Sequence, residues 1–227
     1  MLNLSSRRYA MLFSPMSEFR TKGLFGSRGN MYEKTQMFED VLNSQCKTPA
    51  AVRRIVLGKP QKTRLSATHF QYIREEYDWV RNLLTNVSAK KQRGVNILIY
   101  GKPGTGKTEL AKTLCKEIGA SLFAVSDNRS ERSGGERRSD LSAALGILQS
   151  EQNSVLLMDE AEDVFGASNR SFGFGGFGVS ESGKGSKSKL FFNKLLESNE
   201  VPVIWICNSI DGVDPAHIRC HLFARRI

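Results

Sequence analysis

The spacing of hydrophobic residues changes near residue 95 and divides the chain into two parts. Before that point, apolar residues recur three or four positions apart over Tyr32–Leu42 and again from Ser66 to Val87, which predicts two amphipathic helices. After it, short apolar runs predict buried strands that alternate with helices. The predicted strands are Val95–Tyr100, Leu122–Val125, Val155–Met158 and Val201–Cys207, and the predicted helices are Lys107–Ile118, Leu141–Leu148, Leu190–Leu196 and one starting over Asp214–Arg219.

This alternation predicts an α/β fold over residues 66–227. Strands joined by helices form a parallel sheet with right-handed crossovers and helices on both faces. Residues 1–65 have a different character, because residues 1–30 are rich in Gly and Ser and Thr48–Thr63 combines prolines and basic residues around a short helix. We predict that residues 1–65 form a basic N-terminal extension and linker that is partly disordered.

The basic charge of the chain is confined to its first part. The whole chain has 33 Lys and Arg against 23 Asp and Glu, a net charge of +10, and residues 1–94 hold 17 of these basic residues against 7 acidic ones. Such an excess forms either a solvated basic face or a contact with nucleic acid or another polyanion. No apolar run is long enough to predict a membrane span. The four cysteines form no CxxC pair, so we expect reduced thiols and a cytoplasmic protein.

A glycine-rich loop between the first predicted strand and its helix carries the clearest chemical signal. Residues 101–108 read GKPGTGKT and fit the phosphate-loop pattern G-x-x-x-x-G-K-[ST]. The glycines allow backbone N–H groups to surround phosphate oxygens, and the helix N-terminus adds positive charge. We expect ATP to bind here. The predicted nucleotide-binding residues are Gly101, Pro103, Gly104, Thr105, Gly106, Lys107, Thr108 and Glu109.

Polar residues end two other predicted strands. Asp159 and Glu160 follow Val155–Met158, and Asn208 follows Val201–Cys207. The carboxyl ends of parallel strands meet at one edge of a sheet, so these side chains are expected beside the phosphate loop. Thr108 and Asp159 are the predicted Mg²⁺ ligands. Glu160 is the predicted base for the attacking water, and Asn208 is predicted to contact the γ-phosphate and that water.

These motifs together resemble the AAA+ ATPases. The segments that carry the resemblance are GKPGTGKT (101–108), VLLMDEAEDVF (155–165), VPVIWICNSI (201–210) and DPAHIR (214–219), and they are particularly similar to poorly characterised bacterial members. The resemblance covers about residues 66–221. It implies a P-loop NTPase three-layer sandwich with strand order 5-1-4-3-2, a Walker A loop, the Walker B pair Asp159–Glu160 and a sensor-1 Asn208.

The family resemblance also implies parts that the chain matches less well. The family continues past its fifth strand into a helical lid, whereas Leu222–Ile227 can supply at most that strand, so we expect the lid to be missing. The family's arginine finger follows the DPA helix, and Arg219 is the best candidate here, with Arg225 and Arg226 as weaker ones. The segment Asp127–Asp140 has no aromatic residue for a pore loop, which disfavours protein threading.

The predicted function is Mg²⁺-dependent ATP hydrolysis that remodels an unknown protein or nucleic-acid client. The family implies a homo-oligomeric ring with hydrolysis at subunit interfaces. Two alternatives stay open: an ATP-binding switch with little turnover, which a missing lid favours, and a nucleic-acid-associated ATPase that uses the basic segment.

Overall fold

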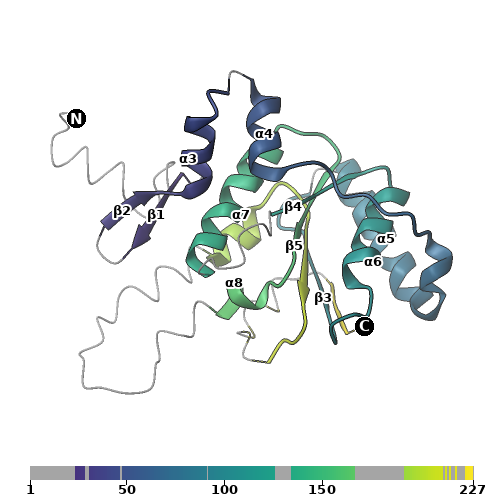
Figure 1. The fold of residues 1–227 in the computed structure, drawn as a ribbon. Helices are drawn as coiled ribbons and strands as arrows, with labels where there is room; N and C mark the ends of the chain where they lie inside the picture. The colour runs from purple at the N-terminus through teal and green to yellow at the C-terminus, as the bar shows by residue number, and fades with distance from the viewer. Residues whose placement is uncertain are drawn as a thin grey trace, which may run out of the picture.

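A parallel five-stranded sheet forms the centre of the computed structural model (Figure 1). The structure describes residues 24–28, 31–46, 48–90, 92–125, 134–166, 192–211, 213, 215, 218 and 223–226. The strands are β3 (Asn96–Tyr100), β4 (Ser121–Ala124), β5 (Ser154–Met158), β6 (Val203–Cys207) and β7 (Phe223–Arg226), and they lie in the order β4-β5-β6-β3-β7. Counted along the chain this order is 2-3-4-1-5, which confirms the predicted 5-1-4-3-2 read from the other edge.

Successive residues of the central strands pack on opposite faces of the sheet. In β6, Ile204 and Ile206 are buried against one group of helices, whereas Val203, Trp205 and Cys207 are buried against the other. Strands β3 and β5 alternate in the same way. This explains why their sequences read as continuous apolar runs, since both faces of each strand are covered.

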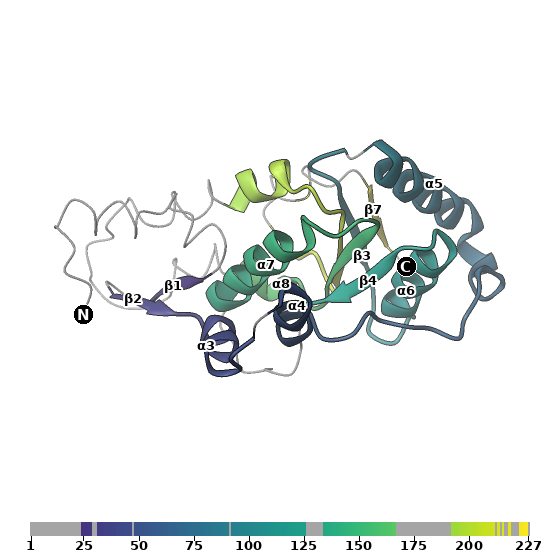
Figure 2. The ribbon, with the colours of Figure 1, turned by 90° about the horizontal axis from the view of Figure 1, so that it is seen from above.

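Helices cover both faces of the sheet, as Figure 2 shows from above. On one face lie the 3-10 segment η1 (Ala67–Ile73), α5 (Arg74–Lys90) and α6 (Lys107–Glu117). On the other lie α7 (Gly134–Leu148), α8 (Glu162–Gly166) and a helix that includes residues 192–198. The three layers confirm the predicted sandwich.

The structure corrects two of the predicted helices. The helix expected from Ser66 is divided into η1 and α5, and Phe70 inside η1 has non-helical backbone angles (φ −115°, ψ 26°). Helix α7 begins at Gly134, whereas the predicted helix begins only at Leu141. The first turns of α7 bury the polar residues Arg138, Asp140 and Ser142, so the apolar spacing that marks a helix is absent there.

The N-terminal part contains more regular structure than the sequence predicts. Strands β1 (Phe25–Arg28) and β2 (Met31–Lys34) form an antiparallel pair, and helices α3 (Gln36–Asn43) and α4 (Pro49–Leu57) follow. Tyr32, predicted as helical, lies in β2, because the Thr35 hydroxyl accepts the Phe38 N–H and caps the helix only from that point.

Both N-terminal helices pack on the α7 side of the sheet. Helix α4 lies beside α7 (Figures 1 and 2). Met37 of α3 and Val56 and Leu57 of α4 are buried in the same apolar cluster as Phe123 and Leu141. The domain boundary at residue 65 stays a prediction, although the segment before it shares this core. Within the described residues, no helix combines the length and apolar character that a membrane span requires.

The side chain of Asn96 makes buried hydrogen bonds on the α7 side of the sheet. Its side-chain N–H₂ donates to the Leu196 carbonyl at 2.7 Å, and its Oδ1 accepts the indole N–H of Trp205 at 3.1 Å. Both Asn96 and Trp205 are fully buried. These bonds tie β3 to β6 and to the helix that contains Leu196.

Replacing Trp205 with Phe should destabilise the fold by about 2–3 kcal/mol, because it opens a cavity and leaves the buried Asn96 Oδ1 without this donor. Trp79→Phe is the matched control. Trp79 is 47% exposed, so its loss should cost about 0.5 kcal/mol. Urea unfolding measures both free energies, and equal losses in the two variants would contradict this packing.

Candidate active site

The phosphate loop connects β3 to α6, and two of its glycines have left-handed backbone angles. Gly104 and Gly106 have φ angles of 79° and 86°, which residues with a Cβ adopt at an energetic cost. A Cβ built on either glycine would meet no atom within 4 Å. The Gly101 N–H donates to the Cys207 carbonyl at 3.2 Å and ties the loop's start to the end of β6. The open space over the two glycines suits a group that approaches the backbone closely.

Lys107, the first residue of α6, lies inside this loop with only 6% of its surface exposed. Its ammonium donates to the carbonyls of Gly101 and Lys102, each at 2.8 Å. It also donates to Asn208 Oδ1 at 3.2 Å. The loop and the end of β6, about a hundred residues apart in sequence, therefore meet at this ammonium as predicted from the strand order.

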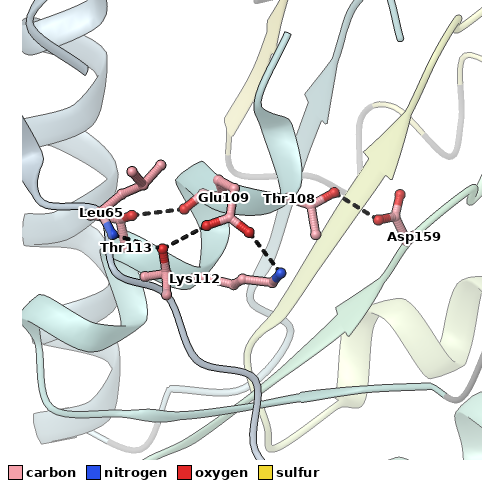
Figure 3. A network of polar contacts seen from close by, with 7 residues as sticks. Leu65, Thr108, Glu109, Lys112, Thr113 and Asp159 are labelled. Carbon is pink, nitrogen blue, oxygen red and sulfur yellow. Dashed lines mark hydrogen bonds and ion pairs between the residues drawn. The ribbon is translucent and has the colours of Figure 1, made fainter. Parts of the chain in front are cut away.

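Thr108 and Asp159 face each other across the same edge of the sheet (Figure 3). The Thr108 hydroxyl donates to Asp159 Oδ2 at 2.8 Å, and Asp159 Oδ1 accepts the Glu160 N–H at 2.9 Å. A hydroxyl and a carboxylate oxygen are the ligand types that Mg²⁺ prefers in proteins. The donor set present therefore fits the predicted metal.

Glu160 lies in the turn between β5 and α8, and its side chain is exposed. Its φ of 49° places it in the left-handed region, which is uncommon for a residue with a side chain. The Ala161 N–H donates to the Ile206 carbonyl at 2.9 Å and anchors the turn to β6. This turn follows the carboxyl end of β5 and so places Glu160 at the edge of the sheet where the phosphate loop lies.

Glu162 supports the site, although the sequence predicted no role for it. Its carboxylate accepts the backbone N–H of Asn208, so it holds the polar end of β6. Burial, together with the charges of Glu162 and Asp159, raises the pKa of the neighbouring Cys207 thiol well above its ordinary value. The signal available in the sequence was a carboxylate two positions after Glu160 at the start of a short helix.

Glu109 makes contacts with the N-terminal linker through its side chain (Figure 3). Its carboxylate accepts hydrogen bonds from the Lys112 ammonium at 2.8 Å and from the Thr63 hydroxyl at 2.6 Å. The Lys112 bond, followed by the Thr63 bond, holds the pKa of Glu109 below its ordinary value. The Lys116 ammonium donates to the Leu65 carbonyl at 3.0 Å. The side chain of Glu109 thus fastens the linker to α6, and its contact with a nucleotide stays a prediction.

The remaining predicted residues have simple placements. Pro103 is exposed at the loop's tip, and the Thr105 hydroxyl donates to the Lys102 carbonyl at 3.0 Å. Arg225 and Arg226 lie in β7. Arg219 lies outside the described residues, so its role as the arginine finger stays a prediction.

Glu109→Gln should weaken the fold at neutral pH but not in acid. A carboxyl with a lowered folded pKa stabilises the protein above its ordinary pKa, and this contribution is lost as the pH falls through the folded value. The side chain is 39% exposed, so we expect under about 1 kcal/mol at pH 7. Urea unfolding of the parent and variant at pH 7 and pH 3 measures the effect, with the exposed Glu197→Gln as control. A constant difference at both pH values would contradict the ion pair.

Comparisons with known proteins agree with this geometry. The family model described as "ATPase family associated with various cellular activities (AAA)" matches residues 97–227. An ATP-dependent zinc metalloprotease FtsH of Leptotrichia buccalis is 30% identical over 68% of this chain and 20% of its own length. A Lon protease of Leptospira interrogans is 30% identical over 58% of this chain and 17% of its own length.

A third relative is a 26S proteasome regulatory subunit 8 homolog of Encephalitozoon cuniculi, which is 31% identical over 64% of this chain and 36% of its own length. The chain therefore spans between about a sixth and about a third of the length of these three relatives. The family match covers more than half of the chain and includes every site residue described above. The chain belongs to the AAA family of ATPases.

Proposed function

We propose that this chain binds ATP with Mg²⁺ and hydrolyses it, and that hydrolysis remodels a partner macromolecule. The observation that carries the proposal is the pair of contacts at one sheet edge. Thr108 donates to Asp159, and Lys107 donates to Asn208, so three loops from separate parts of the chain converge there. Family membership supports nucleotide binding. The requirement for Mg²⁺ and the remodelling of a partner are proposed in addition.

Each side chain has a task that its position allows. Lys107 exchanges the loop carbonyls for phosphate oxygens when nucleotide binds, because its ammonium can then meet a full negative charge. Thr108 and Asp159 would hold Mg²⁺. When bound, Mg²⁺ would supply positive charge beside the β- and γ-phosphates. Glu160 accepts a proton from the attacking water, and Asn208 orients that water and the γ-phosphate.

The partner and the assembly are proposed from the family. Two of the relatives are named as proteases, one of them as ATP-dependent. The third is named as a homolog of a regulatory subunit of the 26S proteasome. We propose a homo-oligomeric ring in the cytoplasm that acts on a protein or nucleic-acid client, with Arg219 completing the neighbouring subunit's site.

Lys107→Ala should weaken ATP binding by about 100-fold, because a charge-assisted contact to phosphate is lost. Lys102→Ala is the matched control, since Lys102 belongs to the same loop but is exposed. Calorimetry with ATP and Mg²⁺ measures both affinities. Thermal unfolding shows whether Lys107→Ala stays folded. An unchanged affinity in a folded Lys107→Ala would rule out the loop as the phosphate site.

Glu160→Gln should keep ATP affinity and lower the hydrolysis rate by about 10²- to 10⁴-fold, because an amide cannot accept the proton from water. Asp159→Asn should instead reduce the part of ATP affinity that depends on Mg²⁺. Phosphate release and calorimetry with Mg²⁺ or with a chelator separate the two effects.

These measurements also distinguish the switch from the enzyme. A parent chain that binds ATP but releases phosphate no faster than Glu160→Gln would be a nucleotide-binding switch. Parental turnover in Glu160→Gln would show that another residue is the base.

A further inference from the structure

Arg137 of α7 reaches across to the turn that carries the two acidic site residues. One guanidinium nitrogen donates to the Glu160 carbonyl at 2.9 Å, and the other donates to the Asp159 carbonyl. The first nitrogen also lies 3.3 Å from the Asp163 carboxylate. The Arg137 side chain is only 12% exposed, whereas that of Asp163 is 53% exposed. The guanidinium is therefore largely withdrawn from water and directed at backbone carbonyls.

The turn needs such a contact for reasons of backbone geometry. Glu160 adopts a left-handed φ of 49°, a conformation that is unfavourable for a residue with a Cβ unless its surroundings hold it there. A guanidinium is a planar, rigid fork whose N–H groups can bind two neighbouring acceptors at once. Arg137 uses this fork on consecutive carbonyls and so fixes the orientation of both peptide units.

The adjacent residue keeps Arg137 in place. Arg138 donates from Nε to the Val164 carbonyl at 3.0 Å, and its guanidinium carbon lies 4.7 Å from the centre of the Phe192 ring. Arg138 is buried, and burial lowers its pKa to about 10. These contacts anchor the start of α7 against α8 and the helix at 192–198. The backbone at Arg137 is therefore held in a fixed position by the contacts of its neighbour.

We propose that Arg137 is a positioning residue for ATP hydrolysis, which holds the Asp159–Glu160 backbone so that both carboxylates face the phosphate loop. This inference rests on the proposed function, because it assigns Arg137 a role in that same site. Arg137 does not contact the reacting atoms itself. Its effect passes through two carbonyls to the side chains on either side of one peptide bond.

Substitutions can separate the carbonyl contacts of Arg137 from its positive charge. Arg137→Met removes both carbonyl contacts but keeps an unbranched side chain suited to a helix. Arg137→Lys keeps the charge but offers a point donor in place of the fork. Asp163→Asn is the matched control, because it removes only the exposed carboxylate partner and leaves the carbonyl contacts intact. Thermal unfolding of all three variants shows whether each remains folded.

Steady-state kinetics tests the role in hydrolysis. We expect Arg137→Met to lower kcat by about 10- to 100-fold, because small displacements of catalytic groups have effects of this size. Its KM and its calorimetric affinity for ATP should change less than about threefold. Arg137→Lys should recover part of kcat, and Asp163→Asn should stay within about twofold of the parent, since exposed ion pairs contribute little. A parental kcat in folded Arg137→Met, or a loss of ATP affinity as large as the loss of kcat, would overturn the proposal.

Hydrogen–deuterium exchange without nucleotide tests the backbone contact independently of turnover. Peptides that contain Asp159–Asp163 should exchange faster in Arg137→Met than in the parent, and they should be unchanged in Asp163→Asn. Unchanged exchange in Arg137→Met would overturn the proposal even if hydrolysis were lost. If the parent itself hydrolyses no ATP while exchange responds as expected, the proposed function fails and the backbone contact stands.

Discussion

The parallel register of β3, β6 and β5 is the constraint on which the rest of the structure depends. Tyr100 lies opposite Cys207, and Met158 lies opposite Trp205, so the three strands end within a residue or two of one another. Parallel strands end at the same edge, and whatever follows each strand must meet there. The phosphate loop, the Asp159–Glu160 turn and Asn208 are the segments that follow. Their contacts are consequences of strand order and register.

The sequence predicted this part well because several independent signals agree in it. Strands buried on both faces read as unbroken apolar runs, and glycines with required left-handed angles identify the loop. Asp159, Glu160 and Asn208 could be recognised because each comes directly after such a run. Their place beside the phosphate loop followed from parallel strands ending at one edge. Hydrogen bonds join Thr108 to Asp159 at 2.8 Å and Lys107 to Asn208 at 3.2 Å.

The residues that support the site could not be predicted in the same way. Arg137 and Glu162 act on backbone groups of other elements, and no spacing along the chain indicates which carbonyl or N–H a side chain will reach. The start of α7 was missed because its inward face is polar. Val56 and Leu57 lie in a segment whose composition resembles a linker. Their burial depends on a complementary apolar surface that only the folded sheet provides.

In the proposed function, three segments far apart in the sequence form one nucleotide site. Hydrogen–deuterium exchange during a titration with ATP and Mg²⁺ tests it most directly, because each segment can be followed in its own peptide. We predict that peptides containing Gly104–Thr108, Asp159–Glu162 and Asn208–Ile210 become protected together, with the same midpoint concentration. Protection confined to Gly104–Thr108, or separate midpoints for the three peptides, would contradict the claim.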